Sequence, residues 1–201
     1  MNNSVNLSKS ARTWLFILVV SAIFWLGAIN VRFIIGNELI TFDEFNFRTG
    51  IPPDEENMIF KMVSNSSILI IITQITTFIS ALFFAFKSRI KIKENGWYLM
   101  CLILFFVFTP VEFYTSYIDL KFILLFAKRP ANHDQLLMLF GERLGFFKGV
   151  PWIALLSYYT VIAIAVFRPL SRTQEQIEKE KKQEMENSYK YYLHEDDDLT
   201  I

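Results

Sequence analysis

The chain has 201 residues, of which 53% are hydrophobic and 20% are charged, and its 20 basic and 20 acidic side chains leave no formal net charge. A water-soluble domain of this size carries more charge and interrupts its apolar runs sooner, so the composition argues against that class. A soluble all-α protein would need core helices without a polar face over about 18 residues, which is rare. The chain also has no basic patch with interleaved aromatic residues, so we expect no nucleic acid among its partners.

Four uncharged apolar stretches occupy much of the chain. An α-helix rises about 1.5 Å per residue and the hydrocarbon core is about 30 Å thick, so roughly 20 residues cross it. The third stretch reaches that length only if it includes Glu112. We therefore predict an all-α integral membrane protein, a four-transmembrane-helix bundle in the lipid bilayer. The predicted spans are residues 13–35, 66–86, 97–118 and 150–168, with outer loops at 36–65 and 119–149.

The charges that flank these stretches predict the orientation of the chain. Residues 1–12 contain Lys9 and Arg12 and no acid, which also fits a signal peptide, but the apolar run that follows is too long and lacks a cleavage site. An uncleaved signal-anchor helix is therefore the better interpretation. Basic residues also follow the second and fourth stretches, whereas the first outer loop is acidic. This pattern predicts cytoplasmic termini in a cell membrane, and the residue bias favours a bacterial cytoplasmic membrane.

The outer loops contain further helical signals. Pro52 and Pro53 end the first part of loop 36–65, and Asp54 is then placed to cap a helix that continues into the second span. Pro110 predicts a kink in the third span. Loop 119–149 has two short apolar patches, 122–127 and 136–140, and Asn132 resembles a cap for the second. We expect two short helices that lie in the outer interface or fold over the mouth of the bundle.

Residues 169–201 form a tail of different composition, charged and ending in an acidic segment with three tyrosines close by. Only a marginal helix is expected there, and we predict that this cytoplasmic tail is partly disordered.

A set of polar residues recurs at one depth, in the outer part of the predicted spans. Charged groups in a bilayer are costly, so they usually face inward and form pairs. Arg32 and Glu112 are the natural pair, because the guanidinium fork matches a carboxylate. The set is either a ligand site that opens outward or a structural pair that sets the helix register. Its members, which are the candidate binding residues, are Arg32, Gln74, Glu112 and Tyr158.

The sequence contains no motif that predicts catalysis, a metal or a cofactor. Its one cysteine, Cys101, lies within an apolar span, and neither of its two histidines, His133 and His194, does. The first hypothesis is therefore a non-catalytic membrane protein, an accessory, scaffold or assembly subunit with a membrane-protein partner or a second copy of itself. The alternative is a small transporter or binder of a hydrophobic or amphipathic ligand, with an outward-facing polar site around Arg32 and Glu112.

Overall fold

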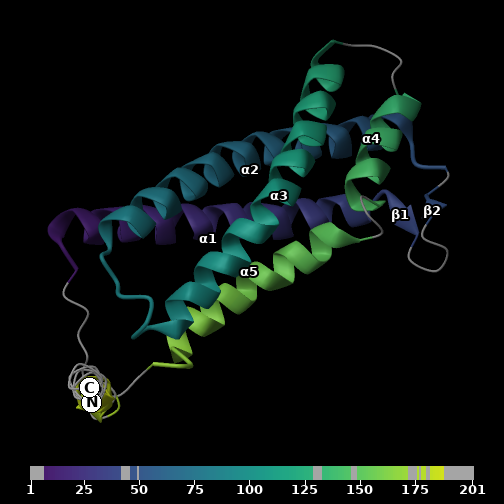
Figure 1. Cartoon of the computed structure of the whole chain (residues 1–201). Coiled ribbons are helices and arrows are strands. Elements are labelled where there is room, and N and C mark those ends of the chain that lie inside the picture. The colour runs from purple at the N-terminus through teal and green to yellow at the C-terminus, as the bar shows by residue number, and fades with distance from the viewer. Residues whose placement is uncertain are drawn as a thin grey trace, which may run out of the picture.

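The protein is an all-α four-helix membrane bundle with a small cap at one end (Figure 1). The computed structural model describes residues 7–41, 46–48, 50–128, 133–145, 149–171, 176, 178–179 and 182–187. Four helices within this part are long and apolar enough to cross a membrane. They are α1 (Lys9–Asn37), α2 (Pro53–Lys87), α3 (Gly96–Lys128) and α5 (Val150–Phe167). Because these helices expose most of their apolar side chains, lipid suits their outer surface.

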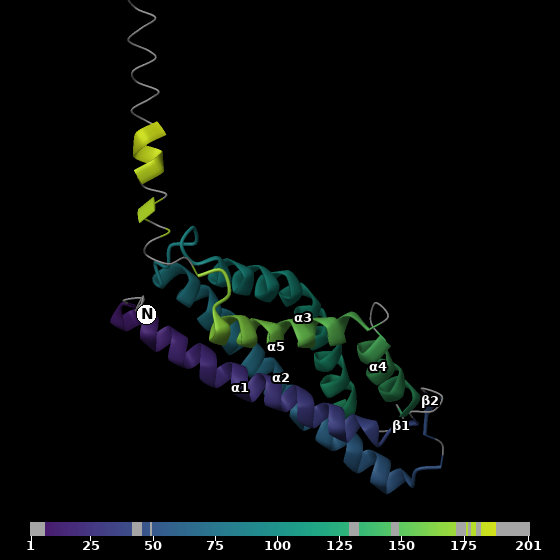
Figure 2. The same ribbon diagram turned by 90° about the horizontal axis from the view of Figure 1, so that it is seen from below.

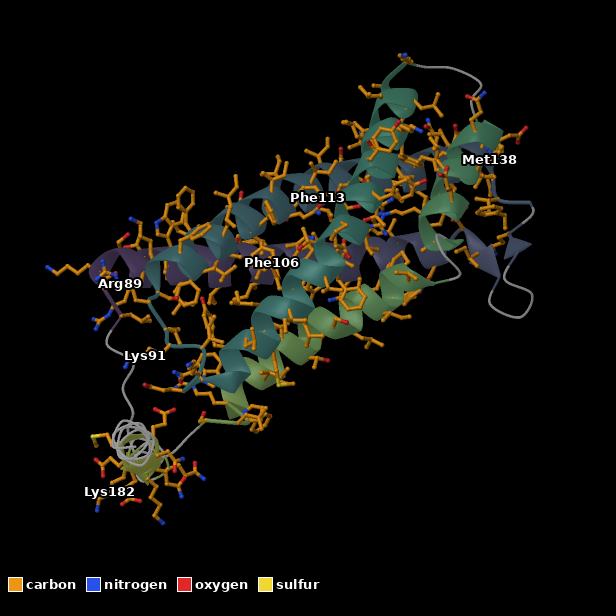
Figure 3. All side chains as sticks on the ribbon, in the orientation of Figure 1. Arg89, Lys91, Phe106, Phe113, Met138 and Lys182 are labelled. Atoms are coloured by element: carbon orange, nitrogen blue, oxygen red, sulfur yellow. The ribbon has the colours of Figure 1, made fainter. Side chains whose placement is uncertain are left out.

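Helix α1 begins and α5 ends at the same end of the bundle, as an even number of spans requires (Figure 1). The core of the bundle joins three of the four helices, with Trp25 and Leu26 from α1, Ile70 from α2, and Ala154 and Tyr158 from α5. Partly buried phenylalanines of α3 pack against this group. In Figure 3, Phe106 and Phe113 lie between Arg89 and Lys91 at one end of the molecule and Met138 at the other.

Helices α2 and α3 extend beyond their predicted spans. Helix α2 begins at Pro53 and continues without a break into the membrane, as predicted, but Pro52 rather than Asp54 occupies the position before its first turn. Asp54, Glu55 and Glu56 lie in that turn, where the positive end of the helix dipole favours acidic side chains. At 35 residues, α2 is about 52 Å long, well over the thickness of the hydrocarbon core.

The prediction that the third helix ends near residue 118 is wrong. Helix α3 continues to Lys128, so residues 122–127 belong to it and do not form a separate interfacial helix. Pro110 lies inside α3, which changes direction along its length (Figures 1 and 2). A proline removes one backbone hydrogen bond and bends a helix, and the turns beyond it persist because Ile118, Asp119 and Phe122 are buried.

The second predicted helix of the outer loop is present as α4 (His133–Gly145), and it folds over the mouth of the bundle. Its Phe140 ring packs directly against Gly36 of α1. A two-stranded antiparallel hairpin lies beside α4, with β1 (Ile40–Thr41) paired to β2 (Asn46–Phe47) so that Ile40 is opposite Phe47. The suggested cap Asn132 is outside the described residues, as is most of the tail from residue 169.

We call this end of the molecule the outer cap: the hairpin, α4, the first turns of α2 and the last turns of α3. It has a hydrophobic core of its own. The buried members of this core are Leu39, Phe60, Val63, Phe122, Leu136 and Phe140.

Candidate functional site

Three charged side chains meet where the outer cap joins the membrane bundle. Asp119 of α3 is fully buried, and its Oδ2 atom contacts Nη1 of Arg32 from α1. Its other oxygen, Oδ1, lies 2.8 Å from Nε of Arg143 in the last turn of α4. One carboxylate therefore holds two guanidinium groups and ties three helices together. We call this set the Arg–Asp–Arg triad.

The predicted pair of Arg32 with Glu112 is thus incorrect, because Asp119 takes the place of Glu112. The two acids are seven residues apart, two turns of α3, and so they lie on one face of that helix. The end of α1 meets this face at the level of Asp119. Glu112 lies two turns deeper in the membrane part, and it is only 5% exposed.

Glu112 has sparse bonding for a buried acid. The Thr115 hydroxyl donates a long hydrogen bond of 3.4 Å to Glu112 Oε2. Within the part of the chain that the structure describes, no basic side chain lies within 4.0 Å of its carboxylate. Among the described residues, Glu112 is therefore the member of this charged group that has no cation in direct contact.

A cavity of about 70 Å³ lies beside the triad and is bordered by Glu112, Arg32 and Arg143. Helices α1, α3, α4 and α5 surround it, together with the first residue of β1, and α2 contributes nothing to its wall. Its polar lining comes from Asn30, Arg32, Asn37, Glu112, Thr115 and Arg143. Its aromatic lining comes from Phe33, Phe140 and Trp152.

The cavity reaches the lipid-facing surface between α1 and α5. Asn30 of α1 and Trp152 of α5 line it, and both are exposed on the outside of the bundle. Figure 2 looks onto this side, where no other helix lies in front of α1 and α5. The rings of Phe33 and Trp152 meet edge to face with centroids 4.6 Å apart, so they form an aromatic edge to the opening.

Two of the four candidate binding residues lie elsewhere. Gln74 of α2 is buried and accepts a hydrogen bond from Ser116 of α3, so it joins two helices away from the cavity. Tyr158 packs edge to face on Trp25, with ring centroids 4.7 Å apart, in the core of the bundle. Arg32 and Glu112 therefore share one site, and neither Gln74 nor Tyr158 lines it.

Sequence reasoning missed Asp119 and Arg143. The sequence places both in the predicted loop 119–149, because a third span of about 20 residues ends before them. The signal that could have found Asp119 is its spacing from Glu112 within a run that stays apolar to Ala127. Arg143 offers no comparable signal, because only the fold of α4 over the bundle brings it to Asp119.

The site is equipped for binding. Two guanidinium groups supply hydrogen-bond donors, Glu112 supplies an acceptor, and three aromatic rings supply apolar walls. Among the described residues, no group of three His, Cys, Asp or Glu side chains is placed to hold a metal ion.

Comparisons of the chain with models of known protein families, with curated proteins and with solved structures found no match.

Proposed function

We propose that this chain is a non-catalytic membrane protein that binds the polar head of an amphiphile in the outer part of the bilayer. The observation that carries the proposal is the cavity beside the Arg–Asp–Arg triad, which combines a buried carboxylate with aromatic walls and an edge at the lipid-facing surface. Ligand sites are usually concave and mostly apolar, with a few placed polar groups.

The size of the cavity supports a small polar head as the bound part. A site for one water molecule needs about 10–15 Å³ on the same scale, so a cavity of about 70 Å³ admits a group of several non-hydrogen atoms but no acyl chain. Apolar chains attached to that group would remain outside, between α1 and α5. Trp152, at the first turn of α5, suits the level of lipid head groups.

A matched pair of variants tests this proposal. Leu155→Trp fills the cavity, because Leu155 lines it, whereas Leu156→Trp adds the same bulk to a neighbour that is 64% exposed to lipid. Each protein is purified from its membrane in mild detergent, and bound amphiphiles are counted by native mass spectrometry. We expect the wild type and Leu156→Trp to retain an amphiphile and Leu155→Trp to lose it. Equal retention by all three proteins would contradict the proposal.

A second candidate is the accessory or assembly subunit. It is favoured by polar and small residues on the lipid-facing side of α1 and α5. Asn30 donates a hydrogen bond of 2.6 Å to the Tyr159 hydroxyl, and both residues are exposed, at depths of about 10–14 Å below the outer ends of their helices. Gly27, a helical turn away, has open space around it. Small and polar residues of this kind stabilise contacts between membrane helices, so a partner helix would fit here.

Co-purification separates this candidate from the first. An assembly subunit should elute in mild detergent with a partner or as an oligomer, and Gly27→Leu should release that partner. A monodisperse monomer that carries a bound amphiphile would support the binding function alone.

We further propose that both termini are cytoplasmic and that the membrane is the cell membrane. The support is the cluster of basic residues at one end, including Arg89 and Lys91 (Figure 3), opposite the acidic start of α2. Reporter fusions after residue 171 and between residues 88 and 95 should report the same compartment, and fusions within residues 48–52 the other.

A further inference from the structure

Glu112 borders the cavity without a cation of the described residues in contact with its carboxylate, and this observation indicates the chemistry of the head group. Placing an ionised carboxylate in a membrane protein costs several kcal/mol unless a cation and hydrogen bonds compensate for it. The two arginines that border the same cavity both contact Asp119. Glu112 borders the cavity, so a cation held there would meet its carboxylate.

The walls of the cavity favour an organic cation. Phe33, Phe140 and Trp152 line it together with Glu112. Ammonium groups are attracted to the faces of aromatic rings, and most strongly to tryptophan when water is excluded. A metal ion would require several oxygen ligands, whereas an ammonium group needs one carboxylate and apolar contact.

The other side of the cavity favours an anion. Arg143 borders the cavity, and its contact with Asp119 uses the Nε atom. A guanidinium group has five N–H donors in a planar fork, which suits a phosphate. Arg143 is slightly exposed at 12%, unlike the fully buried Asp119.

We infer that the cavity binds a small ammonium-phosphate zwitterion, with the ammonium group at Glu112 and the phosphate at Arg143. This inference rests on the proposed function and names its ligand. The same chemistry occurs in two sources, the head group of a zwitterionic phospholipid and a free phosphorylated amino alcohol. The lipid-facing edge at Asn30 and Trp152 favours the phospholipid.

The test compares lipids that share their acyl chains and differ only in the head group. Purified protein is titrated with phosphatidylethanolamine, phosphatidylcholine or phosphatidylglycerol in mixed micelles, and binding is measured by native mass spectrometry. Phosphatidylglycerol has the phosphate without the ammonium group. We expect the wild type to bind at least one zwitterionic lipid about tenfold more tightly than phosphatidylglycerol, a difference of about 1.4 kcal/mol. Free phosphoethanolamine and phosphocholine are tested as competitors.

Single substitutions test which residues produce the head-group preference. Glu112→Gln keeps the shape of the side chain and removes its charge, and it should abolish the preference. Glu55→Gln is the matched control, because Glu55 is exposed in the first turn of α2, and α2 contributes nothing to the cavity wall. Trp152→Leu, at the exposed edge, should weaken the preference and serves as the second variant if Glu112→Gln does not fold.

The outcomes distinguish this inference from the proposed function. Lipid binding without a head-group preference, or a preference that survives in Glu112→Gln, would overturn the assignment of a zwitterionic head group and leave the proposed amphiphile binding intact. Binding of no lipid would overturn both. Displacement of the lipid by a free zwitterion of equal affinity would support the ammonium-phosphate chemistry and overturn the assignment to an amphiphile.

Discussion

The two ends of the bundle are held together by different means. At the outer end, contacts between distant parts of the chain dominate: the Arg–Asp–Arg triad, the apolar core of the outer cap, and His133 Nδ1 at 2.8 Å from Glu56 Oε2. At the opposite end, hydroxyl groups mostly bond to their own helix, as the Ser80 hydroxyl donates to the Thr76 carbonyl oxygen at 2.8 Å.

The half of the bundle away from the outer cap is held by close approach of α1 and α2. Small residues are buried along both helices, which lets the backbones pack tightly without long polar side chains. They include Ala11 and Ser21 of α1 and Ser80 and Ala81 of α2. The comparison shows that polar contacts between distant residues lie at the end that holds the site, whereas close packing of small residues holds the other end.

The largest loss of stability is expected when the central carboxylate of the triad is removed. Asp119→Asn leaves Arg32 and Arg143 buried or nearly so without an anion between them. Breaking a buried ion pair by removing one partner costs about 3–5 kcal/mol. We expect a loss of that size in the free energy of unfolding, measured in mixed micelles. Asp134→Asn, at a side chain that is 96% exposed, is the control and should change little. Equal stability of the two variants would show that the outer end does not depend on the triad.

Glycine substitutions should give the next largest effect. An added Cβ atom at Gly36 would lie 2.5 Å from Cζ of Phe140, so α4 or its ring must shift. Overpacking of this kind typically costs about 1–3 kcal/mol. Gly27→Ala is the matched control on the same helix, because no atom lies within 4 Å of its added Cβ. Thermal melting in detergent should show Gly36→Ala destabilised and Gly27→Ala unchanged or slightly stabilised. The reverse order would mean that α4 does not rest on α1.

The smallest effect is expected from a substitution in the half of the bundle away from the outer cap. Thr77 Oγ1 donates to Ser21 Oγ at 3.0 Å, a buried hydrogen bond between α2 and α1. Such bonds between membrane helices contribute about 0.6 kcal/mol on average. Thr77→Val should therefore lower the unfolding free energy by about that amount, compared with Thr76→Val on the exposed face of α2. A loss as large as that of Asp119→Asn would remove the distinction between the two ends.

The spans could be predicted from the sequence because hydrophobicity and length report directly on the bilayer. The site could be predicted only in part. Periodicity places Glu112 and Asp119 on one face of α3, but it does not say which of them the end of α1 meets. That choice depends on how α1 crosses α3 and on the bend of α3, and neither is encoded in a local pattern. The position of Arg143 is even harder to predict, because it depends on a loop that folds back over three helices.

The outer cap has a consequence for how the chain is assembled. Its core combines residues 39–63 with residues 122–140, and these two segments are separated by two membrane crossings. The first segment therefore leaves the membrane before the second one does, and Leu39 and Phe60 stay exposed to water until the second segment reaches the same side. Closure of the cap then marks the point in synthesis at which three crossings are complete. An interruption before that point would leave an apolar surface outside the membrane, which quality-control proteases could recognise.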